Sequence, residues 1–256
     1  MDLGLTDRVA LVAAGSSGLG LAVATALAAE GAVVSVCGRD PDRLAAAVAG
    51  LEAVAGPGRA SGAALDVRDC DALRRWVDGV AAERGRLDVV VTNAGSPRSG
   101  TAAGLDAAAL REAVELTLAS AVTMVNAALP HLRAGGWGRV LLIASQSAKQ
   151  PIPGLALSNT LRPAVAGYAK TLVGELAGSG VTVNVLAPGM TRTAALEEWA
   201  AELPDGLAGL AADIPLGRVA EPAEFGAVAA FLASEQAAFV TGIVLPVDGG
   251  ATRGLL

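Results

Sequence analysis

The chain has 256 residues, 53% of them hydrophobic and 17% charged, with a formal net charge of −6 at pH 7. Its few basic residues are scattered, which argues against a nucleic-acid-binding surface. The longest apolar runs stay below about 18 residues without a polar break, and the first residues are acidic where a secretory signal would be basic. We therefore expect no membrane span and a cytoplasmic protein.

Short β-branched segments alternate with longer helical stretches, a pattern typical of βαβ units around a parallel sheet. The predicted strands are residues 9–13, 33–37, 60–67, 87–92, 139–144, 181–186 and 244–247. The predicted helices are residues 18–30, 41–55, 69–84, 107–132, 163–177 and 222–233. The fold class is therefore α/β: one doubly wound Rossmann-like domain over residues 1–256, with about seven parallel strands and helices on both faces.

Residues 193–214 interrupt this alternation with an amphipathic stretch that mixes leucines and Trp199 with acidic residues. It follows the carboxyl end of a strand, where sheets of this kind bind ligands. We expect a substrate lid, with plain helical packing as the alternative.

A glycine-rich turn joins the first strand to the first helix. Such a turn lets backbone N–H groups approach a pyrophosphate at the positive end of a helix. The candidate phosphate-binding residues are Gly15, Ser16, Ser17, Gly18, Leu19 and Gly20.

Further motifs follow in order along the chain: Asp66-Val67, Asn93-Ala94-Gly95, residues 138–145, Pro188-Gly189 with Thr193, and Val247-Asp248-Gly249-Gly250. With these motifs the chain resembles the short-chain dehydrogenase/reductase family from end to end, and in particular its 3-oxoacyl-carrier-protein-reductase-like members. The resemblance implies that Asp66 and Val67 flank an adenine and that Asn93, Ala94 and Gly95 lie on the ribose side. It also implies that Pro188, Gly189, Thr191 and Thr193 meet the nicotinamide amide, and that the protein is a homotetramer or homodimer.

The end of the second strand bears on cofactor choice. An NAD enzyme places an acidic residue there to accept the ribose hydroxyls. This chain has Gly38 and then Arg39, whose guanidinium suits a 2′-phosphate, so NADP(H) is favoured over NAD(H). Asp40 is a competitor for Arg39.

Two departures from the family pattern matter. Ala14 stands where the first turn glycine is expected, and a positive φ there costs about 1 kcal/mol or more. Of the family's catalytic tetrad of Asn, Ser, Tyr and Lys, only the serine remains, as Ser145. Thr117 takes the Asn position, Ser158 the Tyr position and Arg162 the Lys position.

These replacements change the proton chemistry that the site can perform. A tyrosine hydroxyl starts near pKa 10 and can be tuned to donate a proton, whereas a serine hydroxyl is far less acidic and an arginine stays charged. Ser158 therefore cannot act as the tyrosine does. Tyr168, ten residues further along a helix, lies on the wrong face to substitute. Pro163 disfavours helix at the preceding residue, so we expect the helix to start late, capped by Asn159 or Thr160, or to kink at Arg162.

The favoured function is an NADP(H)-dependent oxidoreductase acting on a carbonyl or alcohol. Ser145 would polarise a carbonyl, Arg162 would stabilise negative charge, and a water or substrate group would deliver the proton. The alternatives are a non-redox isomerase, dehydratase or cyclase on the same fold, and a catalytically silent binding subunit. The substrate is expected to be a small, mostly apolar or acyl-like molecule. Cys37 and Cys70 show no metal-ligand spacing, so no metal site is expected, and His131 is expected to be a surface or capping residue.

Overall fold

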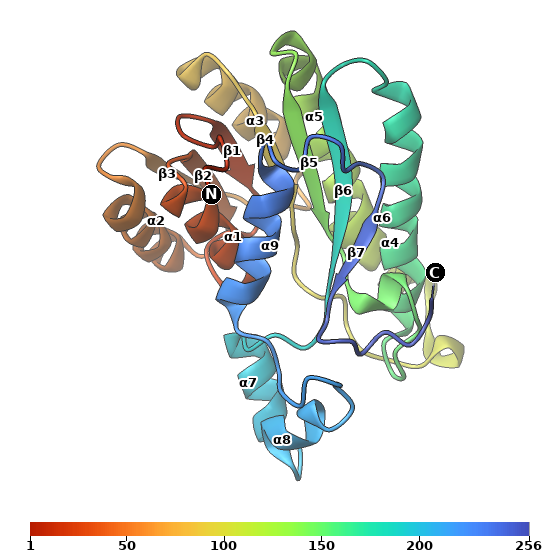
Figure 1. The fold of residues 1–256 in the computed structure, drawn as a ribbon. Coiled ribbons are helices and arrows are strands. Elements are labelled where there is room, and N and C mark those ends of the chain that lie inside the picture. The colour runs from red at the N-terminus through yellow and green to blue at the C-terminus, as the bar shows by residue number, and fades with distance from the viewer. Residues whose placement is uncertain (256) are drawn as a thin grey trace.

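A computed structural model describes residues 1–255; Leu256, the last residue of the predicted domain, lies outside the described part. The described residues form a seven-stranded parallel sheet in the order β3-β2-β1-β4-β5-β6-β7 (Figure 1). Its strands are β1 (Val9–Val12), β2 (Val33–Gly38), β3 (Ala60–Ala64), β4 (Val89–Thr92), β5 (Gly138–Ile143), β6 (Val181–Pro188) and β7 (Val244–Val247). The predicted fold class and strand number are confirmed.

Helices cover both faces of the sheet because its strands β1, β4, β5 and β6 are buried along their whole length. One core joins the sheet to α3 (Cys70–Arg84), α5 (Ser120–Ala134) and α6 (Ala156–Glu175) through residues such as Trp76, Met124 and Val165. The other joins it to α1 (Gly18–Ala29), α2 (Pro41–Ala55) and α9 (Pro222–Ala233), for example through Val23 and Phe225. The strand order reverses between β1 and β4, and ligands bind at the carboxyl ends of the strands beside such a reversal.

The predicted helix over residues 107–132 is divided by a π-helical turn. It consists of α4 (Ala107–Val114), the π-turn η2 (Glu115–Ala119) and α5. By length and composition the stretch Ala107–Ala134 is apolar enough to cross a membrane, but Met124, Val125 and Leu132 are buried against the sheet. It is therefore a core helix of the domain, and its π-turn places Thr117 at the carboxyl edge of the sheet. Single π-turns of this kind are frequent at functional sites.

The predicted late start of the next helix is wrong. The helix α6 begins at Ala156, and Pro163 lies inside one continuous helix. Buried Leu157 and Leu161 pack against Ala109 and Ala113 of α4, and this packing outweighs the local preference of the residue before proline. Asn159 is not a cap: its side-chain amide pairs with both backbone groups of Ile152, at 3.0 and 2.9 Å.

The interrupting segment forms two short helices, α7 (Ala194–Ala201) and α8 (Gly206–Ala211), which project from one end of the domain (Figure 1). Three short turns complete the chain's regular structure: η1 (Ala102–Gly104), η2, and η3 (Gln146–Ala148), which directly follows β5.

Candidate active site

The turn after β1 has the backbone of a phosphate-binding loop. Ala14 has φ 45° and Gly18 has φ 55°, so the turn uses the left-handed region at both positions. The expected strain at Ala14 is therefore present. The N-cap residue of α1, Ser17, makes no side-chain cap, and the first turn carries no acidic residue. The N–H groups at this helix end are thus available to an anion, which the helix dipole also favours.

Close approaches explain two glycines of this region. A Cβ on Gly20 would overlap the carbonyl of Ala14 and lie 2.9 Å from Asn93 Nδ2. Asn93 itself donates to the Ala14 oxygen at 3.4 Å, which ties the end of β4 to the turn. A Cβ on Gly38 would lie 2.5 Å from Ser16 Oγ. Gly20 and Gly38 therefore allow the turn to pack closely against the start of α1, Asn93 and the end of β2.

The Arg39 side chain is exposed and free to bind a 2′-phosphate, as the cofactor prediction requires. Its side chain is 73% exposed, and its nearest carboxylate oxygen, on Asp66, is 3.9 Å away. Asp40 does not compete for it: that carboxylate caps α2 and accepts from Arg43 Nε at 2.9 Å. Asp66 pairs with Arg68 at 2.7 Å, and this hydrogen bond holds the pKa of the Asp66 carboxyl below its usual value.

The stretch after β6 closes the same site from the other side. Gly189 passes so near β7 that a Cβ there would lie 2.7 Å from Asp248. Thr191 is buried and donates to the Gly189 oxygen, while Thr193 caps α7 by accepting from Leu196 N at 3.3 Å. A Cβ on Gly18 would lie 3.5 Å from Thr193 Cγ2. The start of α7 is therefore next to the glycine-rich turn.

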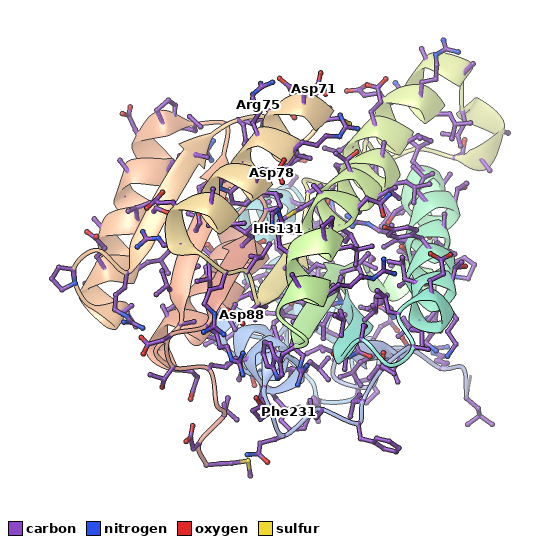
Figure 2. All side chains as sticks on the ribbon, turned by 90° about the horizontal axis from the view of Figure 1, so that it is seen from above. Asp71, Arg75, Asp78, Asp88, His131 and Phe231 are labelled. Atoms are coloured by element: carbon purple, nitrogen blue, oxygen red, sulfur yellow. The ribbon has the colours of Figure 1, made fainter. Side chains whose placement is uncertain are left out.

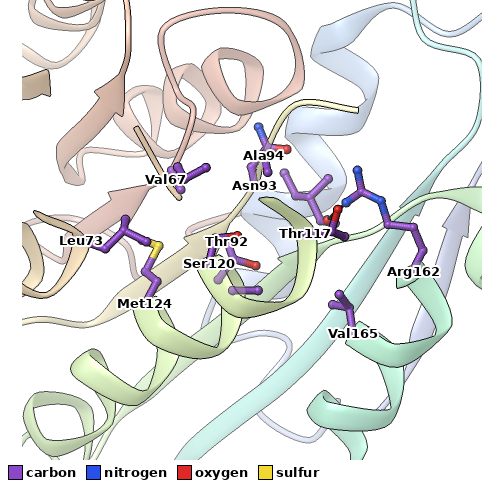
Figure 3. A pocket seen from close by; sticks show the side chains of 13 residues that line it. Val67, Leu73, Thr92, Asn93, Ala94, Thr117, Ser120, Met124, Arg162 and Val165 are labelled. Carbon is purple, nitrogen blue, oxygen red and sulfur yellow. Dashed lines mark hydrogen bonds between the residues drawn. The ribbon is translucent and has the colours of Figure 1, made fainter. Parts of the chain in front are cut away.

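Arg162 and Thr117 face each other across a small cavity at the carboxyl edge of the sheet (Figure 3). The cavity measures about 10 Å³, and Asn93 and Ala94 also line it. Arg162 donates from Nη1 to the Ile143 oxygen at 3.0 Å, but its Nε and Thr117 Oγ1 are both buried without a partner in the described chain. Burial lowers the pKa of Arg162 to about 10, so the guanidinium is still charged at neutral pH.

Ser145 and Ser158 are linked through a third serine that the sequence interpretation missed. Ser145 Oγ caps η3 by accepting from Ser147 N at 3.1 Å. Ser147 Oγ lies 2.8 Å from Ser158 Oγ, and both of these side chains are buried. The serine spacing in Ser145-Gln146-Ser147 was visible in the sequence, but its pairing with Ser158 depends on the fold of the loop between η3 and α6.

The remaining polar candidates have structural roles. Tyr168 donates to Asn126 at 2.9 Å, away from the cavity, and burial raises its pKa to about 12. His131 lies in the last turn of α5 and pairs with Asp78 of α3 at 3.0 Å (Figure 2). Burial raises the pKa of Cys37 to about 12, which leaves it a thiol. The described residues contain no cluster of His, Cys, Asp and Glu that could hold a metal ion.

The fold and the turn define a doubly wound Rossmann-like domain, and comparisons with known proteins agree. The family model described as enoyl-(acyl carrier protein) reductase matches residues 13–252. D-threitol dehydrogenase of Mycolicibacterium smegmatis is 34% identical over 98% of this chain and 95% of its own. Cis-4-hydroxycyclohexanecarboxylate dehydrogenase of Sinomonas cyclohexanicum is 36% identical over 98% and 99%.

Among solved structures, L-sorbose reductase of Gluconobacter frateurii, complexed with NADPH and L-sorbose, superposes with a TM-score of 0.95 at 31% identity and covers both chains fully. The chain belongs to the short-chain dehydrogenase/reductase family and is an oxidoreductase of that family.

Proposed function

We propose that the protein is an NADP(H)-dependent oxidoreductase acting on a carbonyl or alcohol, with Ser158 and Arg162 in place of the usual tyrosine and lysine. The burial and the free N–H group of Arg162 are the observation that carries this proposal. Arg162 is a buried cation that faces the same cavity as Asn93 and Thr117, with one N–H still free to donate. Burying an unpaired charge is costly, and such groups are found where function uses them.

The chain's residues fit a dinucleotide. Gly20 and Gly38 let the glycine-rich turn fold tightly, since a Cβ at either position would strike the Ala14 carbonyl or the Ser16 side chain, and the first amides of α1 are uncapped. Arg39 is free to pair with a 2′-phosphate, because Asp40 is occupied by Arg43. This supports NADP(H) over NAD(H), and the solved relative bound to NADPH supports it as well. When bound, the cofactor would supply the hydride-transfer chemistry.

The protein's own groups would bind and polarise the substrate. Ser145 Oγ already accepts from Ser147 N, so its hydroxyl hydrogen is free to donate to a carbonyl oxygen. Arg162, fixed by its bond to Ile143, would stabilise negative charge that develops nearby. A water or a substrate group would deliver the proton. General acid catalysis is worth about 10²–10⁴-fold, so the loss of the tyrosine slows the reaction without preventing it.

The surroundings of the site favour an apolar or acyl-like substrate. Trp199 of α7 and Leu216, just after the segment 193–214, are 44% and 68% exposed, which supports a role for this segment as a lid. Arg98 and Arg192 are each already paired with a carboxylate, Asp106 and Glu221. They are therefore poor candidates for holding an anionic substrate. A homotetramer or homodimer in the cytoplasm completes the proposal.

Binding and single-turnover kinetics test this proposal together. The protein is first titrated with NADPH and NADH, and tighter binding of NADPH is expected. NADPH oxidation is then followed with a panel of 3-oxo esters, cyclic ketones and aldehydes. Consumption of NADPH with formation of the alcohol supports the proposal. Cofactor binding without turnover of any carbonyl would favour a non-redox enzyme, and absence of cofactor binding would favour a silent subunit.

A further inference from the structure

We propose that Ser147 is a positioning residue of the active site, which fixes the hydroxyl groups of Ser145 and Ser158 and strengthens Ser158 as a hydrogen-bond donor. This inference rests on the proposed function, because it takes Ser158 to donate a hydrogen bond to an oxygen of the carbonyl or alcohol substrate. It adds a residue that neither the family pattern nor the sequence interpretation includes. Two contacts of Ser147 support the inference, one with Ser145 at the end of β5 and one with Ser158 on α6.

The first contact orients Ser145. Ser147 N donates to Ser145 Oγ at 3.1 Å across the turn η3. A serine hydroxyl has one hydrogen to donate and two lone pairs that accept. With one lone pair held by the Ser147 amide, the Ser145 side chain is anchored while its hydrogen remains free. Ser145 is thereby prepared as a donor to a ligand oxygen.

The second contact orients Ser158. The two hydroxyl oxygens of Ser147 and Ser158 lie 2.8 Å apart, and the residues are 3% and 9% exposed. Either hydroxyl can donate to the other in the free protein. When Ser158 donates to a substrate oxygen, Ser147 must donate to Ser158, since no hydrogen of Ser158 is left for the pair. Hydrogen bonds in such a chain polarise each other, so Ser147 makes Ser158 a stronger donor.

Two other hydroxyls on α6 bond to their own helix, and Ser158 differs from them. Thr160 donates to the Ala156 oxygen at 2.9 Å, and Thr171 donates to the Gly167 oxygen at 3.0 Å. Both hydroxyls thus turn back onto the carbonyl four residues earlier, as serine and threonine side chains in helices often do. Ser158 is in the first turn of α6, where no helical carbonyl lies four residues earlier, and the Gly154 oxygen accepts from Gly100 N at 2.7 Å. Its hydroxyl pairs with Ser147 instead. The pair therefore holds the Ser158 hydroxyl in an orientation that its own helix does not impose.

The test combines structure and kinetics of the full-length protein. In crystal structures, Ser147→Ala is expected to release the Ser158 hydroxyl from its present rotamer, while α6 and the turn after β1 stay unchanged. With NADPH and the most rapidly reduced compound of the carbonyl panel, kcat is expected to fall about 3- to 10-fold, the range that one neutral hydrogen bond accounts for. The Kd for NADPH should not change, and the melting temperature should fall by only a few degrees, as expected for the loss of one buried hydrogen bond.

A double-mutant cycle separates positioning from a merely structural role. Adding Ser147→Ala to Ser158→Ala should lower kcat no further, because Ser147 acts through Ser158. Thr160→Val, which removes an unrelated hydroxyl from the same helix, is the matched control and should leave kcat unchanged. An unmoved Ser158 hydroxyl in the Ser147→Ala structure, or effects of the two serine substitutions that multiply, would overturn the inference.

This design also distinguishes the inference from the proposed function. If the wild-type protein reduces no carbonyl, the proposed function fails. The orientation of Ser158 in the two crystal structures still decides whether Ser147 positions it.

Discussion

Thr117 and Arg162 lie on facing sides of one cavity of about 10 Å³, each with a buried polar atom that has no hydrogen-bond partner among the described residues. Thr117 comes from a π-helical turn and Arg162 from the second turn of α6, so two separate elements bring the pair together. Buried polar groups are normally satisfied, and exceptions gather at functional sites. Two of the replaced tetrad positions therefore meet at one site, and Arg162 supplies a charged hydrogen-bond donor there.

Arg162→Met is expected to remove activity without destabilising the fold. The substitution removes a buried charge that lacks an acidic partner, so the free energy of unfolding should stay equal or rise by about 1–2 kcal/mol. Turnover of NADPH with a carbonyl should fall about 100-fold or more, because a preorganised donor is lost. Thermal unfolding and single-turnover kinetics check both effects. Arg75→Met, on the exposed side of α3, is the control, and a similar loss of turnover in both variants would contradict the assignment.

Arg39→Ala is expected to act on cofactor choice alone. The Kd for NADPH should rise about 10- to 100-fold, the value of one charged hydrogen bond to a phosphate, and the Kd for NADH should change little. Fluorescence titration measures both. Arg43→Ala is the matched control, because the Arg43 guanidinium is already held by Asp40. Equal weakening of NADPH and NADH binding would show that Arg39 does not read the 2′-phosphate.

Ala14→Gly is expected to stabilise the protein by about 0.5–1 kcal/mol. Glycine relieves the left-handed strain at φ 45°, although part of the gain is offset by the greater freedom of glycine in the unfolded chain. Ala13→Gly, one residue earlier in a backbone that needs no positive φ, should instead destabilise. Denaturant unfolding of the two variants compares them, and a loss of stability in Ala14→Gly would show that the turn tolerates Ala14 without strain.

The ion pair at the start of α9 predicts a pH dependence. Hydrogen bonding to Arg218, at 2.6 and 2.7 Å, lowers the pKa of Glu224 to about 2 from 4.5. The unfolded chain therefore binds a proton at higher pH than the folded one, so the stabilisation is complete above pH 4.5 and declines as the pH falls toward 2. The difference in melting temperature between wild type and Glu224→Gln should be constant near neutral pH and shrink below pH 4.5.

Glu198→Gln serves as the control for this titration, because Glu198 makes no ion pair within residues 1–255. Its melting temperature should follow that of the wild type across the whole range. A gap between wild type and Glu224→Gln that stays constant down to low pH would contradict the lowered pKa.

Much of the fold was predictable because local signals and tertiary packing agree. The strands β1, β4, β5 and β6 are rich in valine, leucine and isoleucine and buried throughout, and the glycine-rich turn has the positive φ that its sequence suggested. The start of α6 was not predictable, because Pro163 argues for a late start while Leu157 and Leu161 are held by packing on α4. A local preference cannot anticipate a contact with a helix some 50 residues earlier.

The candidate site was predictable residue by residue but not as a set of contacts. Ser145, Ser158, Arg162 and Thr117 follow from alignment with the family pattern. The role of Ser147 and the unpaired atoms of Thr117 and Arg162 require coordinates, because they depend on how η3, the π-turn and α6 meet. The competition between Asp40 and Arg39 was likewise open until Arg43 was seen to occupy Asp40.

The most direct test of the central claim is single-turnover oxidation of NADPH by the wild-type protein with each compound of the carbonyl panel. The measurement is then repeated with deuterated NADPH in place of the ordinary cofactor. At least one carbonyl should be reduced, the rate should be lower with the deuterated cofactor, and Arg162→Met should lower the rate about 100-fold or more while the protein remains folded. Tight binding of NADPH with no oxidation by any carbonyl would contradict the central claim.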